Sequence, residues 1–212
     1  MEQLDSAMVK FSRAFSVATA GLMLAAVAAC GSDNDTDSTP TRSPGARETI
    51  TSPSPSPTSP EDEASASAVE AVTTYYATID SLRQDPEAPI SNLEAVAVST
   101  QLSAQQKFLA SQRNDGLYQV GDTKVIETKI QSVSLDNSDP STGRVPSVTI
   151  DVCWDVSGAD LLDVDGKSVV PSDRADRGWT RLTVANYTWD TDPKGGWRIA
   201  GGKDMEKSPC TA

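Results

Sequence analysis

A polar stretch of the chain, residues 31–64, contains almost no side chain that could enter a hydrophobic core. It consists mainly of Gly, Ser, Asp, Thr and Pro, with a Ser-Pro repeat at residues 54–57. Such a segment buries too little apolar surface to offset the entropy lost on ordering its backbone. We therefore expect a disordered tether over residues 30–65 and a folded domain confined to residues 66–212. The same composition is typical of an O-glycosylated stalk, and that alternative stays open.

The first thirty residues have the layout of a secretory signal peptide. Lys10 and Arg13 precede a run of apolar and small residues from 14 to 29, and Cys30 follows it directly. A basic patch, an apolar stretch of this length and small residues at its end are typical of such signals. The run is too short and too rich in alanine for a confident membrane-spanning helix. We expect residues 1–29 to be removed on export.

The residues around Cys30 indicate which type of export signal this is. The sequence Val27-Ala28-Ala29-Cys30-Gly31 resembles a lipobox. The resemblance implies that the Cys30 thiol receives a diacylglyceryl group and that the signal is cut just before it. Two acyl chains hold a protein on a bilayer, whereas a single chain binds only marginally. We therefore expect a lipoprotein anchored to the extracytoplasmic face of the cell membrane.

The translation start has two candidates. Residues 1–7 are net acidic, which is unusual ahead of a basic signal sequence, whereas Met8 lies just before Lys10 and Arg13. The sequence therefore favours Met8 over Met1 as the true start.

The chain is acidic, with a formal net charge of −12. An acidic surface repels nucleic acid and anionic lipid headgroups, so nucleic acid is not an expected partner. We interpret the charge as keeping an exported domain soluble; recruitment of a basic partner or of metal cations is the alternative. The chain has no histidine, which removes the commonest general base and metal ligand.

The first part of the folded domain is predicted to be helical. Residues 66–83 carry apolar side chains such as Val72 and Ile79 at spacings of three and four, which predicts an amphipathic helix. Two prolines within the next six residues end it. Two more helices are expected, over residues 91–98 and from residue 99 or 100 to about 114, the latter with Leu102, Phe108 and Leu109 facing inward.

From residue 120 the period of the pattern switches from 3.6 to 2, which indicates strands. Residues 120–135 alternate in character for much of their length. Residues 145–156 are rich in β-branched side chains, with Ile150 and Val152 on one face and Asp151 and Cys153 on the other.

Two further strand pairs are expected after these. Asp165-Gly166 predicts a hairpin turn between residues 161–164 and 167–170. Residues 178–191 and 197–202 form a last long hairpin. Helices followed by strands predict an α+β domain whose N-terminal helices pack on one face of a curved antiparallel sheet.

This order of elements resembles the NTF2-like (cystatin-like) superfamily and, more narrowly, the small NTF2-like lipoproteins of actinobacteria. The residues that carry the resemblance are the sequence VTIDVCWD at 148–155, DGK at 165–167, GWRI at 196–199 and Cys210. The resemblance implies a sheet wrapped over a long N-terminal helix, with a cone-shaped cavity between them. It implies little about activity, because that fold hosts unrelated functions.

Cys153 and Cys210 remain once Cys30 carries a lipid. Two thiols in an oxidising compartment predict a disulfide that ties the C-terminal tail to the middle of the sheet. Closing a loop of this length stabilises a fold by about 4 kcal/mol on the chain-entropy model. A redox-active pair is the alternative, but the sequence has no CxxC motif to favour it.

Four side chains are candidates for the lining of the expected cavity: Tyr75, Tyr76, Asp80 and Asp151. Tyrosines on an apolar helix stripe are more often core residues with the hydroxyl at the rim. No nucleophile and base stand at a recognisable spacing, so we assign no catalytic residue and no cofactor. The Asp165-Gly166 turn does not match a calcium loop, because Ser172 stands where the bidentate Glu is required, and we expect no metal site.

The functional hypothesis is a membrane-anchored, non-catalytic binding or scaffolding module. Its partner would be another cell-envelope protein or a small apolar ligand. The alternative from another class is an isomerase- or hydratase-like enzyme that acts on a small apolar ligand in the cavity. A third reading, a surface exclusion factor encoded by host or phage, cannot be separated from the first by sequence.

The lipid anchor generates the first prediction. A Cys30→Ala chain lacks the thiol that accepts the lipid, so we expect cells grown with radiolabelled palmitate to leave it unlabelled. A Ser32→Ala chain keeps the lipobox and should be labelled like the unaltered protein. Labelling of the Cys30→Ala chain would show that the lipid is attached elsewhere.

Overall fold

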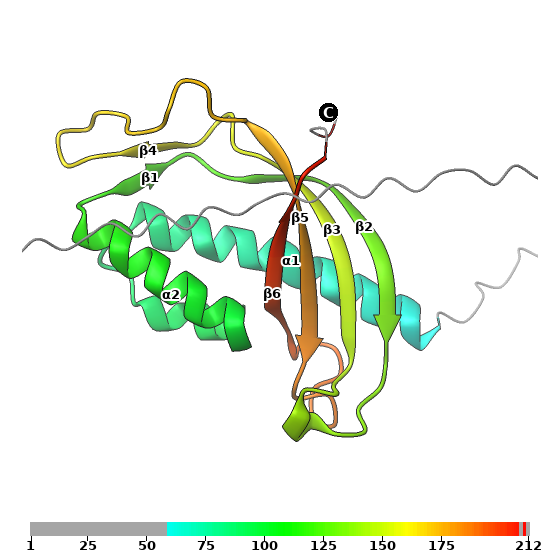
Figure 1. The fold of residues 1–212 in the computed structure, drawn as a ribbon. Coiled ribbons are helices and arrows are strands. Elements are labelled where there is room, and N and C mark those ends of the chain that lie inside the picture. The colour runs from blue at the N-terminus through cyan, green and yellow to red at the C-terminus, as the bar shows by residue number, and fades with distance from the viewer. Residues whose placement is uncertain (1–58, 208–209, 211–212) are drawn as a thin grey trace, which may run out of the picture. The chain divides into compact units, whose positions relative to one another are not determined.

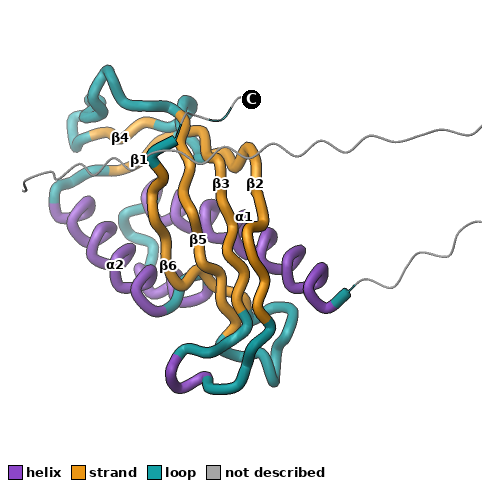
Figure 2. Tube along the Cα trace, turned by 45° about the vertical axis from the view of Figure 1, so that its right-hand side comes forward, coloured by secondary structure: helices purple, strands orange, loops and turns teal. Residues whose placement is uncertain are grey.

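The computed structural model describes residues 59–207 and residue 210. The predicted signal peptide, Cys30 and residues 30–58 of the predicted tether lie outside the described residues. The described part is an α+β fold in which a long helix, α1 (Pro60–Gln84), packs against one face of a curved antiparallel sheet. Figure 1 shows α1 behind the strands, and Figure 2 shows it crossing them at an angle. The predicted fold class is confirmed.

Helix α1 begins six residues earlier than the apolar pattern predicts. The Ser59 hydroxyl accepts a hydrogen bond from the Asp62 backbone N–H, and the Asp62 carboxylate accepts one from the Ser59 N–H. This is a capping box, and Pro60 occupies the first helical position, where it costs no hydrogen bond. Residues 60–65, assigned to the tether by composition, are therefore helical.

The main sheet has four strands in the order β2-β3-β5-β6, all antiparallel to their neighbours. Their bounds are β2 Lys124–Ser134, β3 Ser147–Asp155, β5 Arg177–Asn186 and β6 Trp197–Met205. Val148, Ile150 and Val152 of β3 point to the face that carries α1, and each is fully buried. We call this the inner face of the sheet; it holds the main core.

A short 3-10 helix, η1 (Ile90–Ala95), leads into α2 (Ser99–Asn114), close to the predicted bounds of both elements. Ala97 forms a parallel bridge with Ile199, which places α2 beside β6. Leu109 is buried as expected. The prediction that Phe108 faces inward is wrong: its side chain is 44% exposed and lies under the Arg83 guanidinium, 4.7 Å away.

A second, two-stranded sheet departs from the sequence prediction. Residues 120–135 do not form one strand, because a turn at residues 121–123 separates β1 (Tyr118–Val120) from β2. β1 pairs with β4 (Asp160–Leu162). The Asp165-Gly166 turn is present, with Gly166 at φ +75°, and its two arms are joined by an antiparallel bridge between Leu162 and Ser168. The predicted hairpin is therefore present but short, and its first arm also pairs with β1.

The alternation predicted for much of residues 120–135 is interrupted within β2. Two register shifts, between Val125 and Glu127 and between Ile130 and Ser132, interrupt the pairing with β3. A bulge moves every later side chain by one position, so polar and apolar residues change faces twice along the strand. Ile130 consequently lies opposite Ile150 on the inner side, although this edge position leaves it 40% exposed.

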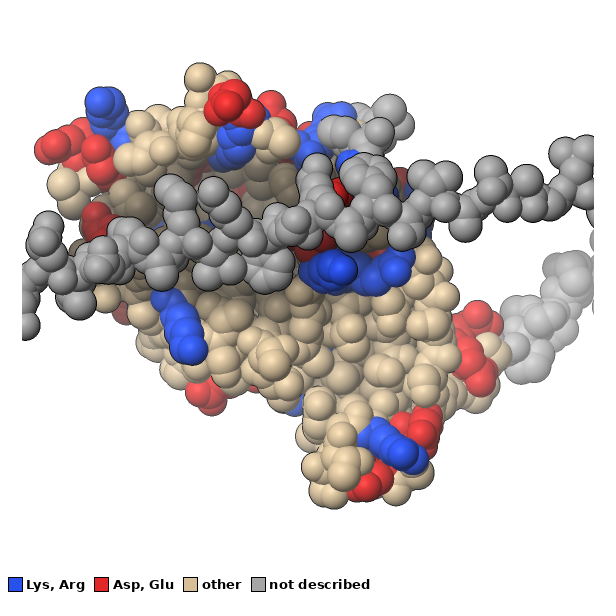
Figure 3. All heavy atoms as spheres, in the orientation of Figure 1, with Lys and Arg blue, Asp and Glu red and all other residues tan. Residues whose placement is uncertain are grey.

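The outer face of the sheet carries a small cluster of its own. The predicted disulfide between Cys153 and Cys210 is confirmed, and it packs with Trp179. The ammonium groups of Lys129 and Lys207 lie 4.8 Å and 3.8 Å from the Trp179 ring centroid. In the view of Figure 3 the surface over the lower part of the sheet is largely uncharged, and charged side chains gather above and below it.

Within the described residues, no helix combines the length and the apolar character needed to cross a bilayer.

Candidate functional site

A cleft of about 530 Å³ lies between α1, α2 and the inner face of the sheet. We call it the main cleft. The walls combine aromatic, aliphatic and polar side chains. They include Tyr75, Tyr76, Ile79 and Arg83 of α1, Gln101 and Gln105 of α2, Trp154 of β3, Thr180 and Leu182 of β5, Asp204 of β6, and the loop residues Arg174 and Ala175.

Helix α1 supplies one wall because Tyr76, Ile79 and Arg83 follow each other at spacings of three and four, on one side of the helix. The neighbouring Tyr75 is 4% exposed, and its hydroxyl accepts a hydrogen bond of 2.6 Å from the Gln101 amide. Burial raises the pKa of Tyr75, and this hydrogen bond offsets part of the rise. The contact fixes the spacing between α1 and α2 at the cleft.

Tyr76 and Trp154 are aromatic side chains in the lining of the cleft. Burial raises the pKa of Tyr76 well above its ordinary value, so the phenol stays protonated. The Trp154 indole N–H donates to the Thr180 hydroxyl at 3.0 Å, and that hydroxyl donates to the Asp204 carboxylate at 2.8 Å. This chain of hydrogen bonds fixes the orientation of the indole across β3, β5 and β6.

The Trp154 ring can lie flat on the sheet because Gly178 stands opposite it on β5. A Cβ atom at Gly178 would overlap the six-membered ring of the indole. The glycine is therefore part of the cleft wall, although it offers no side chain of its own.

A smaller cavity of about 240 Å³ adjoins the main cleft. Four residues border both hollows: Arg83, Thr123, Val156 and Arg174. We call their junction the waist. The Arg83 guanidinium donates to the Gln119 side chain at 3.2 Å and stacks on Phe108, so it is held between β1 and α2.

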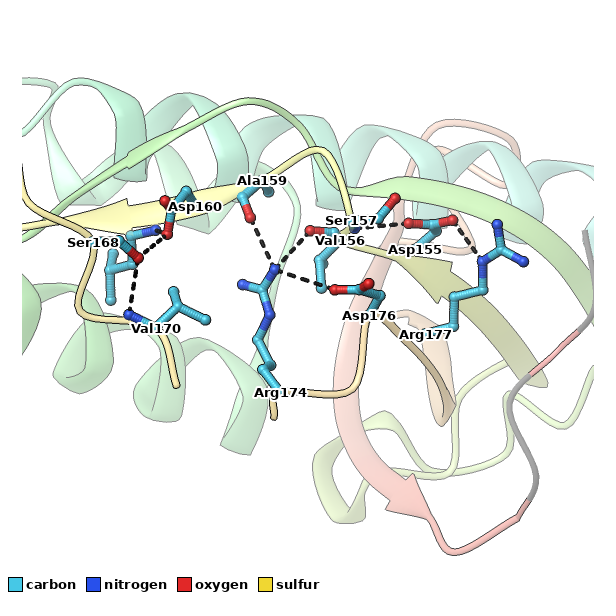
Figure 4. A network of polar contacts seen from close by, with 11 residues as sticks. Asp155, Val156, Ser157, Ala159, Asp160, Ser168, Val170, Arg174, Asp176 and Arg177 are labelled. Atoms are coloured by element: carbon cyan, nitrogen blue, oxygen red, sulfur yellow. Dashed lines mark hydrogen bonds and ion pairs between the residues drawn. The ribbon is translucent and has the colours of Figure 1, made fainter. Parts of the chain in front are cut away.

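Arg174 comes from the loop between β4 and β5 (Figure 4), and it borders both hollows. One terminal nitrogen donates to the backbone carbonyls of Val156 and Ala159, at 2.9 Å and 3.0 Å. The same nitrogen lies 3.7 Å from the Asp176 carboxylate. Arg174 thereby ties the loop to the end of β3.

Asp80 borders a second hollow of about 620 Å³ between α1 and β2, which shares Tyr76 and Thr123 with the main cleft. Its buried carboxylate accepts hydrogen bonds from the Gln119 amide and from the N–H and hydroxyl of Thr123, at 2.7–2.9 Å. Every one of these donors comes from the segment around the β1–β2 turn. Asp80 therefore fastens that turn to α1, and three of its roughly four lone-pair sites accept hydrogen bonds.

The structure places Asp151 away from the other cavity candidates. It alternates with Ile150 and Val152 along β3, so it points to the outer face, where Arg181 donates to it at 2.6 Å and 3.0 Å. Lys207 lies 3.4 Å from the same carboxylate. The hydrogen bonds from Arg181, and then the Lys207 contact, hold the pKa of Asp151 below its usual range. The expectation that Asp151 lines the cavity is therefore wrong.

Arg83 and Arg174 border the main cleft but were missed from the sequence. Arg83 falls in the last turn of α1, where a basic residue is ordinarily explained by the helix dipole. Arg174 lies in a polar loop more than ninety positions later. Only the tertiary fold brings them together, and no local spacing signals it.

No family model matches the chain, and no curated protein matches it either. Among solved structures, the intermembrane space region of the chloroplast protein ARC6 is similar at 22% identity and a TM-score of 0.42, covering 65% of this chain and 93% of that one. Aln2 from a Streptomyces species is similar at 14% identity and 0.36, covering 64% and 88%. Mtr2 is similar at 14% and 0.36, covering 67% and 98%.

The packing of Trp154 on Gly178 generates the second prediction. A Gly178→Ala substitution forces the indole off the sheet, and overpacking of this kind costs about 1–3 kcal/mol of the free energy of unfolding. Urea unfolding of the two chains measures the difference. Gly158→Ala is the matched control, because its new Cβ meets no atom within 4 Å. Equal stability of the Gly178→Ala and Gly158→Ala chains would refute the packing argument.

Proposed function

We propose that the protein is a lipid-anchored, extracytoplasmic binding module whose NTF2-like domain holds a small, largely apolar molecule in the main cleft. The observation that carries the proposal is the cleft itself, about 530 Å³ in volume and walled by Tyr76, Trp154 and Leu182. Small-molecule sites are typically concave, mostly apolar and of this size, with a few placed polar groups.

The walls of the cleft are fixed before any ligand arrives. Tyr75 and Gln101 join α1 to α2, and Trp154 is held through Thr180 to Asp204. A site whose side chains are already ordered loses less conformational entropy on binding. This arrangement supports a binding role for the cleft.

The rival proposal, an isomerase- or hydratase-like enzyme, needs an acid or base aimed at a substrate. Among the described carboxylates near the cleft, Asp80 is surrounded by three donors, and Asp204 is exposed and accepts from Thr180. A general base works through a free lone pair within reach of the substrate. The described geometry favours binding over catalysis.

The proposed anchor gives the binding module a location. With Cys30 acylated, about thirty residues separate the lipid from Pro60, where α1 begins. The domain would work near the membrane surface, taking up its ligand or presenting it to another envelope protein. A scaffolding role toward such a protein is compatible with the same layout.

The third prediction tests the cleft with N-phenyl-1-naphthylamine, a neutral apolar dye that fluoresces when it leaves water. We expect the mature chain without its lipid to bind the dye. Ala175→Trp places an indole at the rim of the cleft and should weaken binding about tenfold or more, which corresponds to about 1.4 kcal/mol.

Ser172→Trp is the matched control, because it puts the same side chain on the same loop at a position outside the cleft lining. It should leave the affinity for the dye unchanged. Absence of binding by the unaltered chain, or equal binding by both tryptophan variants, would reject the main cleft as the ligand site.

A further inference from the structure

The waist between the two hollows contains two guanidinium groups and lies in a chain that is otherwise strongly acidic. Arg83 and Arg174 both border the main cleft and the smaller cavity. They come from different elements, the last turn of α1 and the loop before β5. Two cations drawn to one place in a chain of net charge −12 call for a specific explanation.

The positive charge of Arg83 is less well neutralised than that of Arg174. Within the described residues its charge has no carboxylate at ion-pair distance, and its partners are the neutral Gln119 amide and the Phe108 ring. Its Nε atom is buried and makes no hydrogen bond within the described structure. Burial lowers the pKa of Arg83, and Asp80 offsets part of that effect. A desolvated cation is costly unless an anion is near.

Arg174 is only weakly neutralised. Its ion-pair partner Asp176 lies 3.7 Å away, and the Asp176 side chain is 60% exposed, so water screens the attraction. The backbone carbonyls of Val156 and Ala159 orient the group without cancelling its charge. Figure 4 shows the guanidinium held by these carbonyls beside β4. The Arg174 Nε is also buried without a partner in the described structure.

We propose that the ligand of the main cleft is an amphipathic anion, with one acidic head at the waist between Arg83 and Arg174 and an apolar body against Tyr76, Trp154 and Leu182. Guanidinium groups suit this role because their planar donors pair with carboxylate and phosphate oxygens. The inference rests on the proposed binding function and specifies the class of ligand.

The acidic groups nearby leave room for such a head. Asp80 lies one turn before Arg83 on α1, and its carboxylate is taken up by Gln119 and Thr123 without forming an ion pair with Arg83 or entering the lining of the main cleft. Asp204 borders the cleft from β6, where it accepts from Thr180. Arg83, by contrast, is fixed between β1 and α2. Asp204 and the two arginines thus come from different walls of the main cleft, which gives an amphipathic anion a preferred direction.

The test compares two dyes that differ by one charged group. 1-Anilinonaphthalene-8-sulfonate is N-phenyl-1-naphthylamine with an added sulfonate. The ratio of the two affinities therefore measures how much the anionic group contributes to binding. We expect the unaltered mature chain to bind the sulfonate about tenfold or more tightly than the neutral dye. Equal affinities, or tighter binding of the neutral dye, would overturn the proposal while leaving the proposed binding function intact. Failure of both dyes to bind would reject the binding function itself.

Variants of the two arginines then show where the acidic group of the ligand binds. Arg83→Gln should reduce the affinity for the sulfonate about tenfold and keep the affinity for the neutral dye within about twofold. Arg144→Gln, an exposed arginine outside the cleft lining, makes the same change in net charge and should alter neither. If Arg83→Gln also loses the neutral dye, Arg174→Gln replaces it as the test. An unchanged sulfonate preference in these variants would place the anion elsewhere and overturn the assignment.

Competition distinguishes the kinds of acidic head. Decanoate and decyl phosphate should displace the sulfonate dye from the unaltered chain, and their relative strengths show whether a carboxylate or a phosphate fits better. Decanol carries the same chain without a charge and should compete at least about tenfold less well. Decanol that competes as strongly as both anions would contradict the proposal.

Discussion

The fold depends on the packing of α1 against the inner face of the main sheet. Val72 and Ile79 of α1 share one buried cluster with Ile150 of β3 and Leu182 of β5. Each side chain of this kind contributes about 1.5–3 kcal/mol when fully buried. The helix crosses the curved sheet at an angle, and Tyr76 and Arg83 in the C-terminal half of α1 border the main cleft beside this packing. The site is therefore a consequence of how helix and sheet fit together.

The outer face shows that the sheet is organised on both sides. Alternation along β3 sends Ile150 and Val152 to the core and Asp151 and Cys153 outward. There the disulfide joins a tail residue to the middle of the sheet, 57 positions earlier in the chain. Arg181 and the lysines around Trp179 cover what would otherwise be an open sheet surface. The sheet itself separates this outer cluster from the main cleft.

The sequence allowed the order of helices and strands, the disulfide and the position of the two tyrosines on α1 to be derived, because these follow from local periodicity and from cysteine count. It did not reveal the start at Pro60, since a polar capping box leaves no trace in an apolar pattern. The two bulges in β2 reflect its fit to β3 and have no local signature. The position of Arg83 and Arg174 at the main cleft could not be predicted from the sequence for the same reason, because only long-range contacts make them neighbours.

The central claim is that a ligand occupies the main cleft, and the indole N–H signals of the four tryptophans test it most directly. Trp154 lines the cleft, whereas Trp179 lies on the outer face with the disulfide. In ¹H–¹⁵N spectra of the lipid-free mature chain, with the Trp154 signal assigned through a Trp154→Phe variant, decanoate should shift the Trp154 signal in a saturable way and leave that of Trp179 in place. A Trp154 signal that stays fixed while Trp179 moves would contradict the account.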